Sequence, residues 1–295
     1  MWLFYALLGD VLWSLSDVTN SVLVKHYEKD PIVLSWVQGM LDVAFFIVLS
    51  RFVDVHSAWV WPFALAGACT YLGFLTFFHV LHRVDVSVMN AAWAFLTLFM
   101  SIVGFVFFGE IWSVAQSLGV VLVLGGVLFL SYWHRHVSIP RTLLLLSLLG
   151  LLYVPIFATQ KAALLQGESI VAVFFWPVFA EKFIAFVFPW IHRAHRAKIV
   201  SLRSRLSVPF LLLNVLATSC SITGYFVVAK AYALGLASLV TVTENTQPFF
   251  AIFFAWLLSH VVSFYAPREL LTAQSVRVKL VSFAVVFAGL ALLAM

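Results

Sequence analysis

Long apolar runs, separated by short polar breaks, cover the chain from end to end. Each run is about long enough to cross the ~30 Å hydrocarbon core of a bilayer as a helix. The chain is 64% hydrophobic and 10% charged, whereas soluble domains are about half apolar and a quarter charged. The pattern predicts an all-α integral membrane protein with ten transmembrane helices, at Trp2–Val24, Pro31–Ser50, Ala58–Leu81, Val86–Phe108, Ser113–Trp133, Thr142–Leu165, Ser169–Trp190, Val208–Ala233, Leu236–Val261 and Val278–Leu293.

The second half of the chain repeats the pattern of the first. At an offset of 140 residues the halves align residues of similar character, namely Trp13 with Tyr153, Thr19 with Thr159, Asn20 with Gln160, and Glu28 with Glu168. The offset later becomes 150, because the second half has a longer basic loop at Ile191–Ser207. Five spans per half is an odd number, so the halves insert in opposite senses. We predict two inverted five-helix repeats, residues 1–137 and 138–295.

Basic residues predict the orientation of the chain. Most of the 17 Lys and Arg residues fall in one alternating set of loops, and only Arg51 falls in the other set. The positive-inside rule places the basic set in the cytoplasm and both termini outside. The net charge of +5 therefore reflects topology and not a nucleic-acid partner. The short loops favour a bacterial inner membrane, and Cys69 and Cys220 lie in apolar runs as packing residues.

Several motifs carry a resemblance to a known family. Spans four and nine begin with Ser-rich segments, Pro248 lies near the middle of span nine, and Gly109-Glu110 precedes a span containing Gln116 and several glycines. With the five-plus-five arrangement, this pattern resembles the EamA-type transporters of the drug/metabolite transporter (DMT) superfamily. The chain departs from the family at Leu98, where proline is common, and at Ser259-His260, where Gly-Glu is common.

The resemblance implies the DMT/EamA fold. A central cavity would be lined by spans one, three, four, six, eight and nine, with spans five and ten at the periphery. Small residues in the two peripheral spans would allow close helix contact, at Gly119, Gly125, Gly126, Ala284 and Ala288. The family also implies a transporter and not an enzyme.

Ionisable residues within spans are functional candidates, because burying charge in a bilayer is costly. Asp17 is the first candidate, with Asn20 one helical turn later and Asp10 two turns earlier on the same face. A carboxylate there could exchange a proton for a cationic substrate. Alternatively, Asp17 pairs with Lys161 or Lys230 and only joins two helices.

A second polar group lies in span nine. Glu244, Asn245 and Gln247 directly precede Pro248, which removes a backbone donor and favours a kink. Kinked polar segments near the bilayer midplane bind substrates in transporters. The first repeat offers Asn90 and Trp93 in the matching segment. Interhelical hydrogen bonding is the competing interpretation, and it is favoured for the asparagines.

The remaining candidates are lysines and aromatic residues. Lys161 and Lys230 could bind an anion as point charges, or could extend to the membrane surface. Adjacent Glu181 and Lys182 point about 100° apart on a helix, so we expect a structural or lipid-facing pair. Aromatic side chains in cavity-lining spans could hold a quaternary ammonium or aromatic substrate, and they include Tyr71, Trp93 and Tyr225.

These observations favour a secondary active transporter. It would move a small polar or amphiphilic metabolite by alternating access, coupled to protons, to an exchanged solute, or to neither. Alternatives are a flippase for a lipid or lipid-linked substrate, a membrane-embedded transferase using His79, His82 and Asp85, and a non-transporting membrane subunit. We find no cofactor fingerprint and no metal-ligand set, and expect a monomer or homodimer in the lipid bilayer.

Overall fold

The computed structural model describes residues 1–82, 89, 92–133, 139–191, 193–202, 206–261 and 273–295. These residues are almost entirely helical, with no strand among them, which confirms the predicted all-α class. The helices are α1 (Trp2–Val22), α2 (Pro31–Leu49), α3 (Ser57–Leu81), α5 (Ala92–Phe107), α6 (Val114–Trp133), α7 (Ile139–Leu165), α8 (Ile170–Ile191), α9 (Arg193–Leu202), α10 (Val208–Leu234), α11 (Ala237–Thr243), α12 (Gln247–Val261) and α13 (Ala273–Leu293). Short π and 3₁₀ turns follow α1 at Leu23–Tyr27 and α2 at Ser50–Phe52.

Five helices within the described residues are long and apolar enough to cross a membrane, at Pro31–Phe52, Ser57–Leu81, Leu144–Leu165, Ile170–Ile191 and Val208–Leu234. Three shorter apolar helices accompany them, at Ala92–Phe107, Val114–Gly126 and Leu280–Leu293. The chain is therefore a multi-pass helical membrane protein. The predicted repeat boundary after residue 137 lies outside the described residues.

The ninth predicted span is a broken helix. α11 ends at Thr243, a 3₁₀ turn (η4) occupies Glu244–Thr246, and α12 begins at Gln247. The cause is Pro248, which has no N–H to donate to the carbonyl four residues earlier, that of Glu244. The N–H of Gln247 bonds to that carbonyl instead, and this tightens the turn. The predicted kink is confirmed, and the backbone group freed by the proline is satisfied within the turn.

The basic loop predicted at Ile191–Ser207 contains a helix, which corrects the sequence interpretation. Its segment Arg193–Leu202 has good helix-forming residues, and α9 buries Ile199 and Leu202. Lys198 of α9 pairs with Asp30 at the start of α2. Partial burial alone would raise the pKa of Asp30, but the Lys198 ammonium and the N–H of Ile32 outweigh it and lower that pKa. The Asp30 carboxylate in turn raises the pKa of Lys198.

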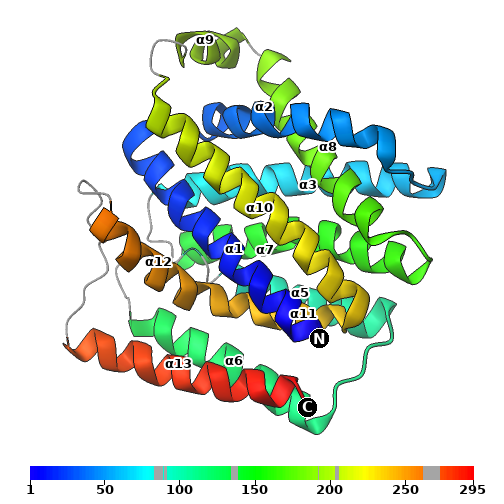
Figure 1. The fold of residues 1–295 in the computed structure, drawn as a ribbon. Helices are drawn as coiled ribbons and strands as arrows, with labels where there is room; N and C mark the ends of the chain where they lie inside the picture. Colours follow the sequence, from blue (N-terminus) through cyan, green and yellow to red (C-terminus); the bar gives the residue numbers. More distant parts are fainter. Residues whose placement is uncertain (83–88, 90–91, 134–138, 192, 203–205, 262–272) are drawn as a thin grey trace.

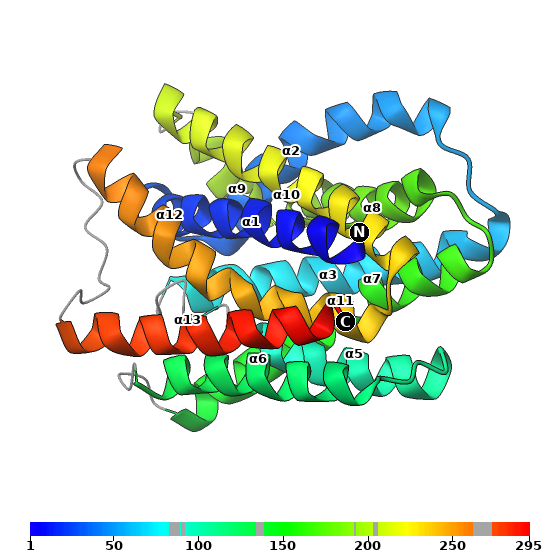
Figure 2. The ribbon, with the colours of Figure 1, turned by 60° about the horizontal axis from the view of Figure 1, so that its bottom comes forward.

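Helices from the two halves of the chain are interleaved (Figures 1 and 2). α1 packs along α10 and α12, α2 along α8, α3 along α7 and α8, and α5 along α7 and α11. α6 and α13 lie side by side at one edge of the bundle. The elements that surround the centre are therefore α1, α3, α5, α7, α8, α10 and the break between α11 and α12.

The pair α6–α13 is in contact through glycines. A Cβ on Gly119 would come within 2.8 Å of the Gly289 carbonyl oxygen, and a Cβ on Gly289 within 2.8 Å of the Gly119 carbonyl oxygen. A Cβ on Gly126 would come within 2.6 Å of the Val286 side chain, whereas a Cβ on Gly125 would have nothing within 4 Å. The prediction that small residues allow close contact holds for Gly119 and Gly126 but is wrong for Gly125.

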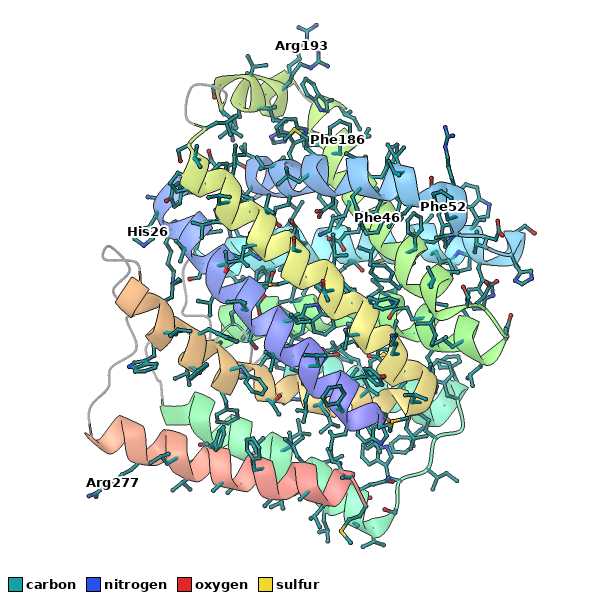
Figure 3. The ribbon with its side chains drawn as sticks, viewed as in Figure 1. His26, Phe46, Phe52, Phe186, Arg193 and Arg277 are labelled. Atoms are coloured by element: carbon teal, nitrogen blue, oxygen red, sulfur yellow. The ribbon has the colours of Figure 1, made fainter. Side chains whose placement is uncertain are left out.

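Polar contacts join the two halves of the chain at one end of the bundle. Glu110, between α5 and α6, accepts from the N–H groups of Ala237 (2.5 Å) and Ser238 (3.0 Å) at the start of α11. His56 pairs with Glu168 at the same end. The labelled residues His26 and Arg277 lie at the left of Figure 3, with Phe52 at the right. The labelled His26 and Arg277 thus lie at the end of the bundle opposite Phe52.

Candidate functional site

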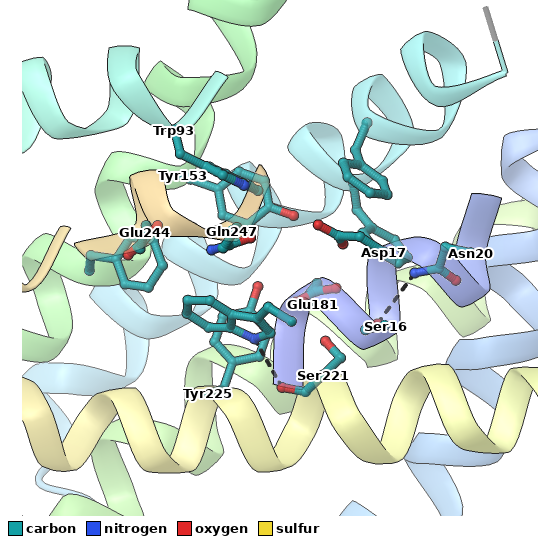
Figure 4. Close-up of a pocket in the computed structure, with 14 residues that line it drawn as sticks. Ser16, Asp17, Asn20, Trp93, Tyr153, Glu181, Ser221, Tyr225, Glu244 and Gln247 are labelled. Carbon is teal, nitrogen blue, oxygen red and sulfur yellow. Dashed lines mark hydrogen bonds between the residues drawn. The ribbon is translucent and has the colours of Figure 1, made fainter. Parts of the chain in front are cut away.

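A cavity lies at the centre of the bundle, where helices of both halves meet (Figure 4). Its water-accessible volume is about 40 Å³. Its walls come from α1, α3, α5, α7, α8, α10 and the break in the ninth span, lined by Trp13, Ser16, Asp17, Asn20, Phe74, Phe77, Trp93, Tyr153, Phe157, Glu181, Ser221, Tyr225, Glu244 and Gln247. The six spans expected from the family resemblance all contribute, and α8 is an addition.

Three carboxylates give the cavity its electrostatic character. Asp17 projects from α1, Glu181 from α8 and Glu244 from the 3₁₀ turn of the ninth span. All three are buried, with exposed fractions of 8%, 1% and 1%. No lysine or arginine among the described residues lines the same space. The cavity is therefore suited to a positively charged group.

Aromatic rings form most of the remaining wall. Trp13 meets Tyr225 edge-on with 5.2 Å between ring centroids, and Trp93 meets Tyr153 in the same way at 5.3 Å. Phe157 packs beside both Trp13 and Tyr153. The indole N–H of Trp13 donates to the Ser221 carbonyl at 3.2 Å and orients that ring (Figure 4). Such faces attract organic cations through the ring quadrupole.

Asn20 is held at the edge of the cavity by other polar side chains. The Gln38 amide of α2 donates to the Asn20 oxygen at 2.8 Å, and the Asn20 amide donates to Ser16 at 3.5 Å. Both partners are buried. Asn20 is thus pre-oriented beside Asp17, one turn along α1, as the sequence predicted.

Glu181 and Lys182 correct the sequence interpretation. The two residues are buried in the protein, with 1% and 2% exposed, and do not face lipid. The lysine side chain folds back so that its ammonium lies 2.8 Å from the Glu181 carboxylate, despite the angle between the two Cβ directions. The same ammonium is 4.0 Å from Asp42 of α2. Glu181 lines the cavity, whereas the sequence alone assigned it only to a structural or lipid-facing pair.

The two lysines proposed for anion binding lie away from the cavity. Lys161 donates to the carbonyls of Tyr232 and Gly235, at 3.0 and 2.8 Å, and so stabilises the C-terminus of α10. Lys230 lies over the Phe226 ring, 4.7 Å from its centroid. The positions of these lysines do not support anion binding in this cavity.

Three further candidates have other positions. Asn245 donates to the Thr97 hydroxyl (2.8 Å) and the Val242 carbonyl (3.1 Å), which favours the interhelical hydrogen-bond interpretation. Tyr71 packs edge-on against Phe188 and does not line the cavity. Asn90 lies outside the described residues, so its predicted role stays a prediction.

The repeat offset could have found two lining residues that single-residue reasoning missed. Tyr153 aligns with Trp13, and Phe157 aligns with Asp17, and all four line the cavity. Ser16, Phe74, Phe77 and Ser221 carry no comparable signal, because serine and phenylalanine are frequent throughout the spans. The proposed transferase residues His79 and His82 are exposed at the end of α3, and Asp85 lies outside the described residues.

Comparisons with known proteins agree with this architecture. Residues 1–132 match the model of the EamA-like transporter family. One solved structure, titled "Crystal structure of protein", is 16% identical to the chain, covers 99% of it and 94% of its own length, and superposes with a TM-score of 0.65. That likeness shows a shared fold. No curated protein matches the chain.

The family match confirms the resemblance predicted from the sequence. Residues 1–132 of this multi-pass membrane protein are similar to the EamA-like transporter family, which is part of the DMT superfamily.

Proposed function

We propose that the chain is a secondary transporter for a small amphiphilic organic cation and works by alternating access. The observation that carries this proposal is the cavity itself, in which Asp17, Glu181 and Glu244 face a space walled by aromatic rings. A carboxylate pairs with an ammonium group, and the aromatic faces contact both the cation and its apolar body. The family match supports transport over enzymatic chemistry.

The packing supports ten spans in two inverted repeats. In the two repeats α1 corresponds to α7, and α3 corresponds to α10. Exchanging the halves therefore turns the α1–α10 contact into the α7–α3 contact, and both contacts are present. Asp42 and Lys182 occupy equivalent positions, 140 residues apart, and face each other. Related halves of this kind can rock about a central site to expose it alternately on each side.

Two features support a bacterial inner membrane location with both termini outside. The basic residues gather at one end of the bundle, and the positive-inside rule puts that end in the cytoplasm. The opposite end carries the Glu110 and His56–Glu168 contacts between repeats. We infer that these contacts close the external entrance in the conformation described here.

The proposal predicts that the cavity distinguishes ligands of similar size by their charge. Phenethylamine should stabilise the purified protein in a thermal-shift assay, whereas phenylpropionate should not. Binding at a hundredfold excess over the dissociation constant adds about 2.7 kcal/mol to the stability of the folded state. Asp17→Asn should reduce the stabilisation by the amine, because it removes a buried counter-charge.

Lys161→Met is the matched control, because Lys161 lies away from the cavity and should leave amine binding unchanged. Uptake of a stabilising amine into proteoliposomes then tests transport. Stabilisation by carboxylates that is lost in Lys161→Met would contradict the proposal. Stabilisation by lipid head groups alone would favour the flippase alternative.

A further inference from the structure

A second polar cluster lies behind the cavity wall, where α1 meets the break in the ninth span. Asp10 of α1 accepts a hydrogen bond from the Thr246 hydroxyl at 3.2 Å. Thr243 and Gln247 lie beside the same carboxylate, and Glu244 is within electrostatic reach of it. We propose that Asp10, Thr243, Glu244, Thr246 and Gln247 form a binding site for sodium, adjacent to the organic-cation cavity.

Two buried carboxylates require a positive charge nearby. Asp10 is 0% exposed and Glu244 is 1% exposed. Among the described residues, no ion pair joins either carboxylate to a basic side chain. Oδ1 of Asp10 and Oε1 of Glu244 also accept no hydrogen bond there. Burying such groups without compensation is costly, so a cation bound between them stabilises this conformation.

The available ligands are oxygen atoms, which hard cations prefer. The Thr246 hydroxyl donates its hydrogen to Asp10, and the Thr243 hydroxyl donates to the Val240 carbonyl at 2.8 Å. Each hydroxyl therefore keeps lone pairs that can coordinate an ion. The Gln247 side-chain amide is fully buried, and neither its nitrogen nor its oxygen has a hydrogen-bond partner among the described residues. Protons would neutralise the carboxylates without using these oxygen atoms as ligands, whereas a sodium ion would coordinate them.

The titratable groups that face the cluster are acidic or neutral. Tyr232 of α10 lies near both carboxylates, Tyr153 of α7 and Tyr225 of α10 lie near Glu244, and Glu110 approaches Tyr232 from the loop before α6. Tyrosine is neutral at pH 7. None of these groups supplies a positive charge, so a bound cation or protons must balance the carboxylates, and a sodium titration at fixed pH distinguishes the two.

The site shares two residues with the cavity, since both Glu244 and Gln247 line it (Figure 4). Two residues of α1 contact the same segment. Asp10 accepts from Thr246, and the Ser14 hydroxyl donates to the Gln247 carbonyl at 3.2 Å. Sodium bound here would hold the break of the ninth span against α1 and so fix the position of Glu244. Its role as a coupling ion rests on the proposed transport function, whereas ion binding itself does not.

Thermal unfolding of the full-length protein in detergent tests the site. Sodium chloride should raise the melting temperature saturably relative to potassium chloride at equal ionic strength. Asp10→Asn should abolish this response. Thr246→Val, which keeps the side-chain shape and removes one ligand, should raise the half-saturating sodium concentration about tenfold, the ratio expected for one lost neutral contact.

Asp17→Asn is the control, because it alters the cavity and not the ion cluster. It should lose stabilisation by the organic amine and keep stabilisation by sodium, so the two proposals can fail separately. Equal melting temperatures in sodium and potassium, or an unchanged sodium response in both Asp10→Asn and Thr246→Val, would overturn the site. A response that follows pH and not sodium would overturn it in favour of a proton shared between the carboxylates.

Discussion

At the scale of single residues, Lys182 explains how buried charges are tolerated beside the cavity. Its ammonium serves both Glu181 and Asp42, and it also lies 4.7 Å from the centroid of the Phe74 ring. Phe74 and Glu181 line the cavity, so the lysine sets the charge that a substrate meets there. We infer that Lys182 partly neutralises Glu181 and leaves Asp17 and Glu244 as the stronger cation ligands.

Lys182→Met should therefore be strongly destabilising. Removing one partner of a buried charge pair costs about 3–5 kcal/mol, because the remaining charges are left uncompensated. Glu181→Gln is the matched variant, and it should cost much less because Lys182 keeps Asp42 as its partner. Melting temperatures of the two variants in detergent provide the comparison. A Glu181→Gln variant as unstable as Lys182→Met would contradict this assignment of charges.

At the scale of helices, close contact depends on where small residues face. α6 and α13 meet through Gly119 and Gly289, and Gly126 fits against Val286. Neighbouring Gly125 is exposed and faces open space. Two adjacent glycines in one helix thus have opposite environments, because successive side chains on a helix point about 100° apart.

Gly126→Leu should disrupt the α6–α13 contact, and Gly125→Leu should not. Overpacking at a tight contact typically costs about 1–3 kcal/mol. The same substitution one residue away makes an equal change in helix propensity, so the difference between the variants isolates packing. Thermal stability measured side by side checks this. Equal melting temperatures would show that α6 and α13 separate without cost.

At the scale of the whole molecule, the distribution of charge predicts the orientation of the bundle in the membrane. α9 is basic and pairs with the start of α2 through Lys198 and Asp30. Asp54, between α2 and α3, lies in a loop on the opposite side of the predicted topology. The positive-inside rule places α9 in the cytoplasm.

Single cysteines at exposed positions test that orientation. In a background with Cys69 and Cys220 replaced by alanine, Asp54→Cys should react with a membrane-impermeant maleimide in intact cells. Ala194→Cys on α9 should react only after permeabilisation, since both positions are exposed on the protein and differ in the side they face. Labelling in the reverse order would invert the proposed topology.

The sequence by itself determined the membrane class, the apolar helices, the repeat offset and the break at Pro248, because these depend on composition and on local backbone chemistry. It also placed Asp17, Asn20, Trp93, Tyr225, Glu244 and Gln247 among the candidates, and all six line the cavity. Local pattern was sufficient for these residues, because polar and aromatic side chains in a central span are favoured at a protein-lined cavity over the lipid-facing surface.

Only the tertiary structure decided which candidates meet. Lys161 stabilises the end of α10, Lys230 lies against Phe226, and Glu181 turns into the cavity with Lys182 behind it. These outcomes depend on the rotation of each helix about its axis, on neighbours as far as 74 residues away in the chain, and on how far a long side chain can bend. Periodicity within one span contains neither, so the packing of the two interleaved halves selected the site.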